Sequence, residues 1–266
     1  MIVDRAAAVL AEHGTETPRV DAEWIVAHVA GVSRSGLVTL CHEVDDAAVW
    51  PLVLRRANRE PLAYVLGEWG FRRLTLRCDE RALVPRPETE VVVERCIELL
   101  RDMPSPWVLD VGTGTGAIAL ALADEVPGAH VVAIDASAEA LSLAAENAVL
   151  SGLQVELLLR DLRDGLPPGP FDLVVSNPPY VLAVELDTLE PEVRDWEPRE
   201  ALLDEGQTEA LARAALDVLA RGGVLVLEIH ERRAEETRGL LENLGYRVRI
   251  SIDLSGRDRI VEGKAA

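Results

Sequence analysis

The stretch VLDVGTGTGAIALALA, residues 108–123, combines a short apolar strand, a glycine-rich turn and the start of a helix. The residues before the turn have the apolar density of a strand buried on both faces, as in a parallel sheet covered by helices. Gly112, Gly114 and Gly116 permit a positive φ and let a ligand approach the backbone closely. The stretch therefore predicts a β–α unit whose turn binds a ligand; the alternative is a tight turn whose glycines serve packing alone.

Two details of the turn indicate the class of that ligand. The dinucleotide fingerprint G-x-G-x-x-G directs a helix N-terminus at a pyrophosphate, but here the third glycine comes one residue early. Asp110 precedes the turn, and a carboxylate beside the turn suits a cationic ligand better than a diphosphate. The turn therefore favours a cationic ligand over a dinucleotide.

Strand, turn and helix alternate from residue 107 onward. We expect strands at 107–111, 130–135, 155–160, 171–176, 223–229, 246–251 and 257–262, and helices near 116–124, 137–150, 208–220 and 231–244. Such alternation predicts an α/β fold, a seven-stranded and mostly parallel sheet with helices on both faces. The turn between the last two strands is too short for a crossover helix, so the last strand should be antiparallel.

The residues before 107 have a mostly helical pattern. Further short helices are expected at 45–60, where Pro51 complicates the pattern, and at 61–67. Residues 21–31 place four apolar side chains on one helix face, namely Ala22, Ile25, Val26 and Val29.

A hairpin and a hinge should connect the helical part to the α/β part. Residues 68–78 alternate around two arginines, as a small hairpin does. The two prolines within 82–90 mark the hinge, after which a helix is expected at 90–103. The expected domains are a helical domain at 1–80, with the hairpin and hinge at 68–90, and the α/β domain at 88–266.

Length and composition describe a globular chain of one large domain or two smaller ones. Its 266 residues are 48% hydrophobic and 27% charged, and no apolar run reaches the roughly 18 residues that span a bilayer. Asp4 and Arg5 fall where a signal peptide would have a basic start and a longer apolar stretch. We therefore expect a cytoplasmic protein with no membrane partner.

The residue types that form metal sites and disulfides are scattered along the chain. The three cysteines include no C-x-x-C pair, and the five histidines are dispersed. No Ser-His-acid motif, Walker loop or metal-spaced pair of histidines occurs. We therefore expect no metal site.

The net charge of −19 argues against a long nucleic-acid partner, because neutralising phosphates requires a basic surface. Residues 1–87 carry 11 arginines and 12 acidic residues, so they are close to neutral. Residues 88–266 carry 16 basic and 34 acidic residues and hold nearly all of the negative charge. No direct nucleic-acid partner is expected.

Acidic residues follow the next two expected strands. Asp135 ends the second strand, where an acid can accept both hydroxyls of an adenosine ribose. A helix cap is the alternative role, but Ser137 is better placed for it. Asp161 and Leu162 end the third strand. An acid there could bind the adenine amino group, and an apolar residue could cover the adenine ring. A plain loop without a binding role is an equal alternative.

The stretch FDLVVSNPPYVLA, residues 171–183, is the most specific signal for chemistry. Pro178 keeps Asn177 out of the helical region, and neither Pro178 nor Pro179 has an N–H to donate. The Asn177 side-chain oxygen and the Pro178 carbonyl could therefore each accept one N–H of a planar –NH₂ group, while Tyr180 lies against that group. This would hold the nitrogen in line with an electrophilic carbon, which is catalysis by position. The alternative is a rigid turn with a core tyrosine.

With these motifs the chain resembles the class I S-adenosylmethionine methyltransferases, and more closely the peptide chain release factor glutamine methyltransferases. The resemblance covers almost the whole chain. It includes TPRVDAEWIVAHVAGVSRSGL, REPLAYVLGEWGF, LVPRPETE, LDVGTGTGAIALALA, SNPPYV, WEPREAL and DLSGRDRIV. Asn-Pro-Pro-Tyr alone also occurs in enzymes that methylate the amino groups of adenine or cytosine, so the N-terminal domain and PRPETE narrow the choice.

The resemblance implies a cofactor, a substrate and a role for each motif. S-adenosyl-L-methionine would be held at its methionine part by the glycine turn, whose residues are Gly112, Thr113, Gly114, Thr115 and Gly116. Asp135 would hold the ribose, and Asp161 and Leu162 would lie at the adenine. Leu162 stands where the family often has an aromatic residue, so aliphatic contact replaces stacking.

The implied substrate is the glutamine of the Gly-Gly-Gln loop in a class 1 release factor. Asn177, Pro178, Pro179 and Tyr180 would bind its amide, with Asn177 and Tyr180 as the catalytic residues. EIHERR, residues 228–233, lacks the glycine-containing continuation that is usual in the family.

Two rival functions remain open at this point. An amino-methylating nucleic-acid methyltransferase would need a basic face or a base-reading domain, and the near-neutral residues 1–87 offer neither clearly. A non-catalytic binding protein could keep the cofactor fold without turnover, and the intact Asn177 and Tyr180 speak against it.

Overall fold

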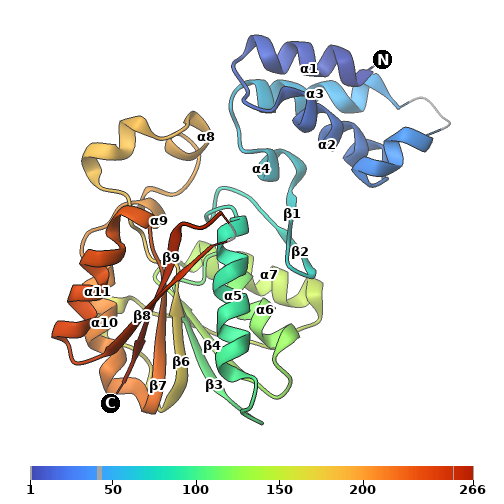
Figure 1. The fold of residues 1–266 in the computed structure, drawn as a ribbon. Coiled ribbons are helices and arrows are strands. Elements are labelled where there is room, and N and C mark those ends of the chain that lie inside the picture. The colour runs from blue at the N-terminus through green and yellow to red at the C-terminus, as the bar shows by residue number, and fades with distance from the viewer. Residues whose placement is uncertain (1, 41–43, 254, 266) are drawn as a thin grey trace. The chain divides into compact units, whose positions relative to one another are not determined.

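The computed structural model describes residues 2–40, 44–253 and 255–265, and its chain divides into two units (Figure 1). The first unit consists of Met1–Glu68 together with Leu189–Trp196. The second consists of Trp69–Thr188 and Glu197–Ala266. A segment of eight residues from the second half of the chain thus belongs with the N-terminal helices, which no local feature of the sequence predicts.

The first unit is a small helical bundle around an apolar core. Ala22, Ile25 and Val26 are buried, as predicted, while Val29 is half-buried. Its helices are α1 Ile2–Glu12, α2 Pro18–Ala30, the 3₁₀ helix η1 Arg34–Thr39, α3 Asp46–Ala57, α4 Leu62–Leu66 and α8 Pro191–Arg194. The α2 helix has proline in its first turn and ends at Gly31, whose φ of 65° is the left-handed value that favours glycine. The α3 helix continues through Pro51 without interruption.

A chain of buried charges secures the returning segment to this bundle. The Arg56 guanidinium donates to Asp21 at 2.7 Å and pairs with Glu192 at 2.8 Å. Arg59 also donates to Glu192, from Nε at 2.7 Å and from Nη2 at 2.5 Å. Because Asp21 and Arg56 are almost fully buried, each loses its hydration, and the ion pairs with the oppositely charged neighbours offset that desolvation cost.

The second unit contains a seven-stranded sheet in the order β5-β4-β3-β6-β7-β9-β8. Its strands are β3 Trp107–Val111, β4 His130–Asp135, β5 Glu156–Leu159, β6 Phe171–Ser176, β7 Leu219–Glu228, β8 Arg247–Ile252 and β9 Asp258–Lys264. The pairs from β5 through β7 are parallel, whereas β9 is antiparallel to both β7 and β8. The prediction of a mostly parallel sheet with an antiparallel last strand is confirmed.

Helices cover both faces of the sheet (Figure 1), and neighbouring strand residues pack in different clusters. Val108 packs in the cluster that includes α5 and α6, whereas Leu109 packs in the cluster that includes α10 and α11. The helices are α5 Pro87–Leu100, α6 Ala117–Glu125, α7 Ala138–Ser151, α9 Arg199–Leu202, α10 Gln207–Val218 and α11 Ala234–Asn243. The inner strands β3, β4 and β6 therefore bury both of their faces, which explains their nearly continuous apolar sequences.

The remaining elements are short. The predicted hairpin forms as β1 Glu68–Phe71 and β2 Leu74–Arg77, a two-stranded sheet. The helix expected at 231–244 is divided into the 3₁₀ turn η4 Glu231–Arg233 and α11. Two further 3₁₀ helices, η2 Leu162–Asp164 and η3 Ala183–Thr188, were not expected, nor were α8 and α9. Among the described residues, no helix is both long and apolar enough to cross a membrane.

Candidate active site

The predicted site residues follow the carboxyl ends of adjacent parallel strands, which meet at one edge of the sheet. The glycine turn follows β3, Asp135 ends β4 and Asn177 follows β6. Since β3 lies between β4 and β6, the turn, the acid and the asparagine come from three neighbouring strands.

The sequence left open whether the glycines of the turn serve ligand binding or packing, and the turn contains glycines of both kinds. All three have a positive φ: 73° at Gly112, 54° at Gly114 and 83° at Gly116. A Cβ at Gly116 would lie 3.1 Å from Leu120 and 3.3 Å from Ala144, so a side chain there would force these neighbours to shift. A Cβ at Gly112 would meet nothing within 4 Å, so the space beside it can receive a ligand.

The two threonines of the turn are buried and hold its shape. The Thr113 hydroxyl donates to Asp110 at 2.7 Å, and the Thr113 N–H donates to the Ile134 carbonyl at 3.0 Å. The Thr115 carbonyl accepts a hydrogen bond from the Asn147 side chain at 2.9 Å. These bonds tie the turn to β3, β4 and α7.

Asp110 has one carboxylate oxygen in use and one without a partner. Its Oδ2 accepts from the Thr113 hydroxyl and, at 3.2 Å, from the Ala119 N–H. Its Oδ1 is buried and has no hydrogen-bond partner among the described residues. Burial raises the pKa of this carboxyl to about 7. An unpartnered carboxylate oxygen at the base of an open glycine turn fits a cationic group such as an ammonium or a sulfonium.

Asp135 connects the turn to the start of α7. Its Oδ2 accepts from the Gly114 N–H and its Oδ1 from the Ser137 N–H, both at 2.9 Å. Burial raises the pKa of Asp135, and these N–H bonds oppose the shift. Ser137 caps α7 by accepting from the Ala140 N–H at 3.1 Å, which is the role that the sequence suggested for it. Each Asp135 oxygen keeps a lone pair for a ribose hydroxyl, and that role stays a prediction.

Asp161 and Leu162 lie beyond β5, beside the strand that ends at Asp135. The N–H of Arg160 donates to the Asp135 carbonyl at 2.9 Å, which joins the two strand ends. Asp161 pairs with the Arg163 side chain at 2.6 Å and accepts from its N–H at 2.8 Å. Leu162 is half-buried against the cluster under α10. The carboxylate of Asp161 thus already has a partner, and contact of either residue with adenine stays a prediction.

Asn177 and Pro178 present two acceptor oxygens for which the described residues supply no donor. The strand end before them is anchored, because the Ser176 hydroxyl donates to the Val111 carbonyl at 2.7 Å. Asn177 is half-buried, and its Nδ2 donates to the Thr89 hydroxyl at 3.3 Å. Among the described residues, none donates to the Asn177 Oδ1 or to the Pro178 carbonyl. Neither oxygen is therefore committed to a donor among these residues; Pro178 itself is buried, and the binding of a substrate –NH₂ by these two oxygens stays a prediction.

Pro179 and Tyr180 complete the motif. Both are half-buried, and the Tyr180 ring lies 6.1 Å from the ring of His230. Burial raises the pKa of the Tyr180 hydroxyl, and the charge of Glu228 raises it further. The phenol therefore stays neutral and offers a ring face rather than a charge.

The sequence did not point to two polar residues that join this site. The Thr89 hydroxyl donates to the Glu228 carboxylate at 2.7 Å, and Thr89 in turn accepts from Asn177. Glu228 is only 1% exposed, and burial raises its pKa to about 7. Its position at the end of β7, next to the end of β6, was a readable signal; Thr89 had no local one.

An ion pair between Arg86 and Glu197 holds the start of α5, the helix that carries Thr89. The Arg86 guanidinium donates to both oxygens of the buried Glu197 at 2.7 Å. Glu197 also accepts from the Val84 N–H at 3.4 Å. Burial raises the pKa of Glu197 although Arg86 opposes the shift. The PRPETE and WEPREAL segments are thus held together beside the site.

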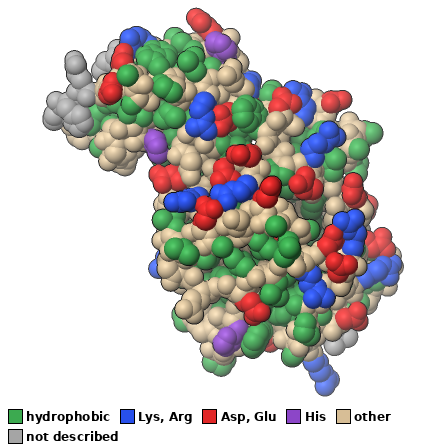
Figure 2. All heavy atoms as spheres, turned by 180° about the vertical axis from the view of Figure 1, so that it is seen from behind, with side chains coloured by type: hydrophobic (Ala, Val, Ile, Leu, Met, Phe, Trp, Pro, Cys, Tyr) green, Lys and Arg blue, Asp and Glu red, His purple; other side chains and the backbone are tan. Residues whose placement is uncertain are grey.

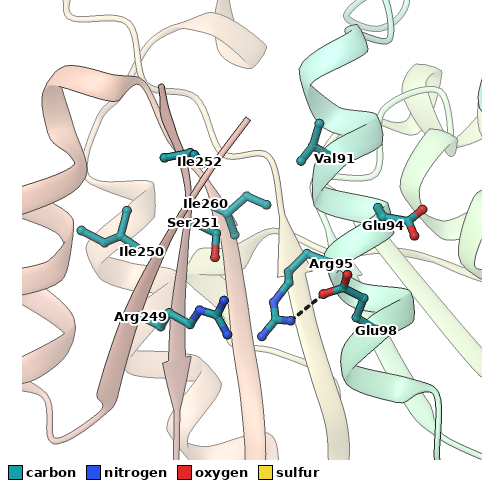
Figure 3. Close-up of a pocket in the computed structure, with 9 residues that line it drawn as sticks. All are labelled: Val91, Glu94, Arg95, Glu98, Arg249, Ile250, Ser251, Ile252 and Ile260. Carbon is teal, nitrogen blue, oxygen red and sulfur yellow. Dashed lines mark hydrogen bonds and ion pairs between the residues drawn. The ribbon is translucent and has the colours of Figure 1, made fainter. Parts of the chain in front are cut away.

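The second unit has two notable hollows. One, of about 310 Å³, is lined by residues that include Tyr180, Glu228 and His230, and so adjoins the site. The other, of about 380 Å³, lies between α5 and β8, where Arg95 pairs with Glu98 at 2.7 Å (Figure 3). The larger hollow is lined by none of the predicted site residues, so its size does not indicate a role in the chemistry.

Comparisons with known proteins match both parts of the chain to family models. Residues 94–190 match the family model "Methyltransferase small domain", and residues 2–67 match "PrmC N-terminal domain". The release factor glutamine methyltransferase of Deinococcus radiodurans is 43% identical over 275 residues, covering 100% of this chain and 98% of the relative. The one of Rhodopirellula baltica is 42% identical, covering 95% of this chain and 91% of the relative.

Solved structures share the fold at lower identity. A methyltransferase from Pyrococcus furiosus has a TM-score of 0.53 at 20% identity, covering 73% of this chain and 89% of its own. A 16S rRNA N2 G1207 methyltransferase of T. thermophilus, in complex with AdoMet and guanosine, has a TM-score of 0.54 at 18% identity, covering 75% and 50%. The fold of the second unit is that of class I methyltransferases, and the full-length similarity shows that the chain belongs to the release factor glutamine methyltransferase family.

Proposed function

We propose that this protein methylates the side-chain amide nitrogen of the glutamine in the Gly-Gly-Gln motif of a class 1 peptide chain release factor. The observation that carries the proposal is the pair of open acceptors, Asn177 Oδ1 and the Pro178 carbonyl, at the end of β6. A primary amide has two N–H donors in one plane, and these two acceptors match them. Because the chain belongs to the release factor glutamine methyltransferase family, we propose that this amide is that of a glutamine side chain.

The residues around the glycine turn fit S-adenosyl-L-methionine as the cofactor. The open space at Gly112 and the unpartnered Asp110 Oδ1 suit a cationic methionine part, with Thr113 and Thr115 holding the turn in shape. Asp135 would accept the ribose hydroxyls, and Asp161 and Leu162 would lie at the adenine. The cofactor supplies an electrophilic methyl group on a sulfonium.

The chain's own residues act on the substrate amide by position. Asn177 and the Pro178 carbonyl would each accept one N–H, which fixes the plane of the amide and enriches the nitrogen lone pair. Tyr180 would lie against that plane, and Pro179 keeps the turn rigid. No strong base is needed beforehand, because the alkylated nitrogen loses its proton readily.

The charge distribution supports a protein substrate over a nucleic acid. On the face shown in Figure 2, Lys and Arg side chains are interspersed with Asp and Glu side chains. Such a face does not offer a phosphate backbone the continuous basic surface that it needs. We infer that no direct nucleic-acid or membrane partner is used, and that the enzyme works in the cytoplasm where release factors act. Residues 1–80 would recognise the release factor, and 88–266 would carry out the transfer.

Mass spectrometry of a purified release factor tests this proposal. After incubation with enzyme and isotopically labelled S-adenosyl-L-methionine, we expect one labelled methyl group, on the glutamine of the Gly-Gly-Gln motif. A release factor with Gln→Glu at that position should remain unlabelled, because a carboxylate has no N–H for the two acceptors. An unlabelled wild-type release factor, with enzyme that binds the cofactor, would refute the proposed substrate.

A further inference from the structure

A hydrogen-bond chain runs from the predicted substrate site into the core of the second unit. The Asn177 Nδ2 donates to the Thr89 Oγ1 at 3.3 Å, and the Thr89 Oγ1 donates to the Glu228 Oε2 at 2.7 Å. We propose that Thr89 and Glu228 are positioning residues that hold the Asn177 carboxamide with its oxygen toward the substrate amide. This inference rests on the function proposed above and deepens it.

The direction of the chain follows from the number of hydrogens available. A threonine hydroxyl has a single hydrogen, and an ionised carboxylate can only accept. When Glu228 is ionised, Thr89 must spend its hydrogen on Glu228, so toward Asn177 it can only accept. The Asn177 side chain must then offer its –NH₂ to Thr89 and leave Oδ1 as the outward acceptor.

The opposite orientation of Asn177 would disable the proposed acceptor pair. A reversed carboxamide would present its own –NH₂ to the substrate –NH₂, and two donors cannot bond to each other. The Pro178 carbonyl would then be the sole acceptor of the pair. The identity of the atom that Asn177 turns outward is therefore as important as its location.

Burial makes this orientation well defined. Thr89 is 4% exposed on the first turn of α5 and Glu228 is 1% exposed at the end of β7, so water does not compete for either group. Three separate parts of the chain each contribute one member: α5, the turn after β6, and β7. Arg86, bonded to Glu197, braces the start of α5 three residues before Thr89.

Protonation of Glu228 would release this constraint. Burial places its pKa at about 7, and the other groups that act on it are Thr89, Arg86, Glu88 and Arg259. A protonated Glu228 can donate to Thr89, which frees the threonine hydrogen to donate to the Asn177 Oδ1. Since the acid form is the disabling one, the rate should fall as the pH falls through about 7.

The hydroxyl of Thr89 is tested with a matched pair of variants in single-turnover methylation of a release factor. Thr89→Val removes the hydroxyl at similar volume and should slow the reaction about three- to tenfold, the equivalent of one neutral hydrogen bond. Thr89→Ser keeps the hydroxyl and should restore the rate toward wild type. Cofactor affinity should be the same in both. Equal rates for the valine and serine variants would overturn the inference.

The pH profile tests Glu228 separately from its neighbours. We expect wild type to lose rate on the acid side of about pH 7, and Glu228→Gln to lose that pH dependence, because glutamine does not titrate in this range. His230→Gln is the control, since His230 lines the same hollow as Glu228; this variant should keep the acid limb. An acid limb that survives Glu228→Gln would contradict the proposed role.

A spectroscopic measurement judges the hydrogen-bond chain without any activity. The chain has four asparagines, so selective ¹⁵N labelling of asparagine side chains gives few signals, and Asn177→Ala identifies the one of interest. The Asn177 –NH₂ signals should move in Thr89→Val and should titrate near pH 7 in wild type but not in Glu228→Gln. Signals that respond to neither change would refute the chain. Failure of wild type to methylate a release factor would instead refute the proposed function.

Discussion

At the scale of single residues, the surroundings of a side chain decide what its oxygen atoms can do. Asp110 and Asp135 flank the same glycine turn, yet both Asp135 oxygens hold backbone N–H groups while Asp110 has one oxygen without a partner. Asn177 has its amino group engaged and its oxygen open. Three predictions belong to this scale.

Replacing Asn177 should act mainly on the chemical step. Asn177→Ala removes one acceptor at the reacting nitrogen, and by analogy with removing one preorganised active-site hydrogen bond we expect turnover to fall by about 10²–10³. Asn177→Asp keeps oxygen acceptors but adds charge beside the sulfonium and loses the donor to Thr89. If acceptor geometry alone matters, Asp should retain more activity than Ala in single-turnover assays. A near-wild-type rate for Asn177→Ala would refute the mechanism.

Asp135 should determine cofactor affinity. Asp135→Ala loses charge-assisted hydrogen bonds to ribose, worth about 1.5–3 kcal/mol in total, so binding should weaken about 10- to 150-fold by calorimetry. Because Asp135 also holds the Gly114 and Ser137 N–H groups, the alanine variant should lose some stability as well. Asp135→Asn keeps one acceptor oxygen and serves as the control for the fold. Unchanged affinity in the alanine variant would remove Asp135 from the site.

Asp110 should make the stability of the protein depend on pH. Its folded pKa of about 7 lies above its ordinary value of 3.8, so the folded state favours the neutral acid. The stability that this contributes is present at low pH and is lost as the pH rises between those two values. Asp110→Asn does not titrate. In urea unfolding, the free energy of unfolding of this variant relative to wild type should therefore rise from pH 4 to 7, by up to about 1.4 kcal/mol per unit. A difference that is flat with pH would contradict the shift.

At the scale of elements, the glycines of the turn between β3 and α6 have two different roles, helix packing and the opening of space for a ligand. Gly116 lets α6 lie close to α7, since a Cβ there would approach Leu120 and Ala144. Gly112 leaves open space above the strand end. Both have the positive φ that strains other residues by roughly 1–2 kcal/mol, so a pair of alanine variants separates packing from ligand binding.

The two alanine variants should fail in different assays. Gly116→Ala adds steric overlap to the backbone strain, so we expect it to lose about 1–3 kcal/mol more stability in denaturant unfolding than Gly112→Ala. Gly112→Ala should instead weaken cofactor binding, because its methyl group takes up the open space. The assignment of that space to the cofactor would be wrong if Gly112→Ala bound the cofactor as tightly as wild type.

At the scale of the whole molecule, charge separates the candidate substrates. The net charge of −19 repels a polyanion, and most of it lies in 88–266, the part that contains the predicted site. A folded protein substrate does not have to neutralise a phosphate backbone. The choice between a release factor and a nucleic acid therefore has an electrostatic test.

Duplex DNA should be neither a substrate nor an inhibitor. We expect no labelled methyl group on DNA, and release factor methylation should be unchanged by micromolar DNA at physiological salt, because non-specific complexes have dissociation constants of about 10⁻⁴–10⁻⁶ M even for basic proteins. The control is the release factor alone at the same ionic strength. Transfer to DNA or RNA at a rate that matches transfer to protein would overturn the proposed substrate class.

Features that depend on a few neighbouring residues could be predicted from the amino-acid sequence. The sheet strands, the glycine turn and the Asn-Pro-Pro-Tyr exit from β6 could be predicted because periodicity, glycine φ and proline geometry act over a few neighbouring residues. The alternation of strands and helices also predicted the mostly parallel sheet. The short helices within 183–202 escaped prediction, because runs of four to six residues have too little periodicity to detect.

The hydrogen-bond partners of the site residues, by contrast, follow from the tertiary structure alone. Asn177 meets Thr89 across 88 positions, and Thr89 meets Glu228 across 139, so no local pattern joins them. Likewise Arg59 and Glu192, 133 positions apart, bring a late segment into the first unit. A hydrogen-bond partner or a raised pKa depends on which groups the fold packs together and on how fully it excludes water, and neither quantity is a property of neighbours along the chain.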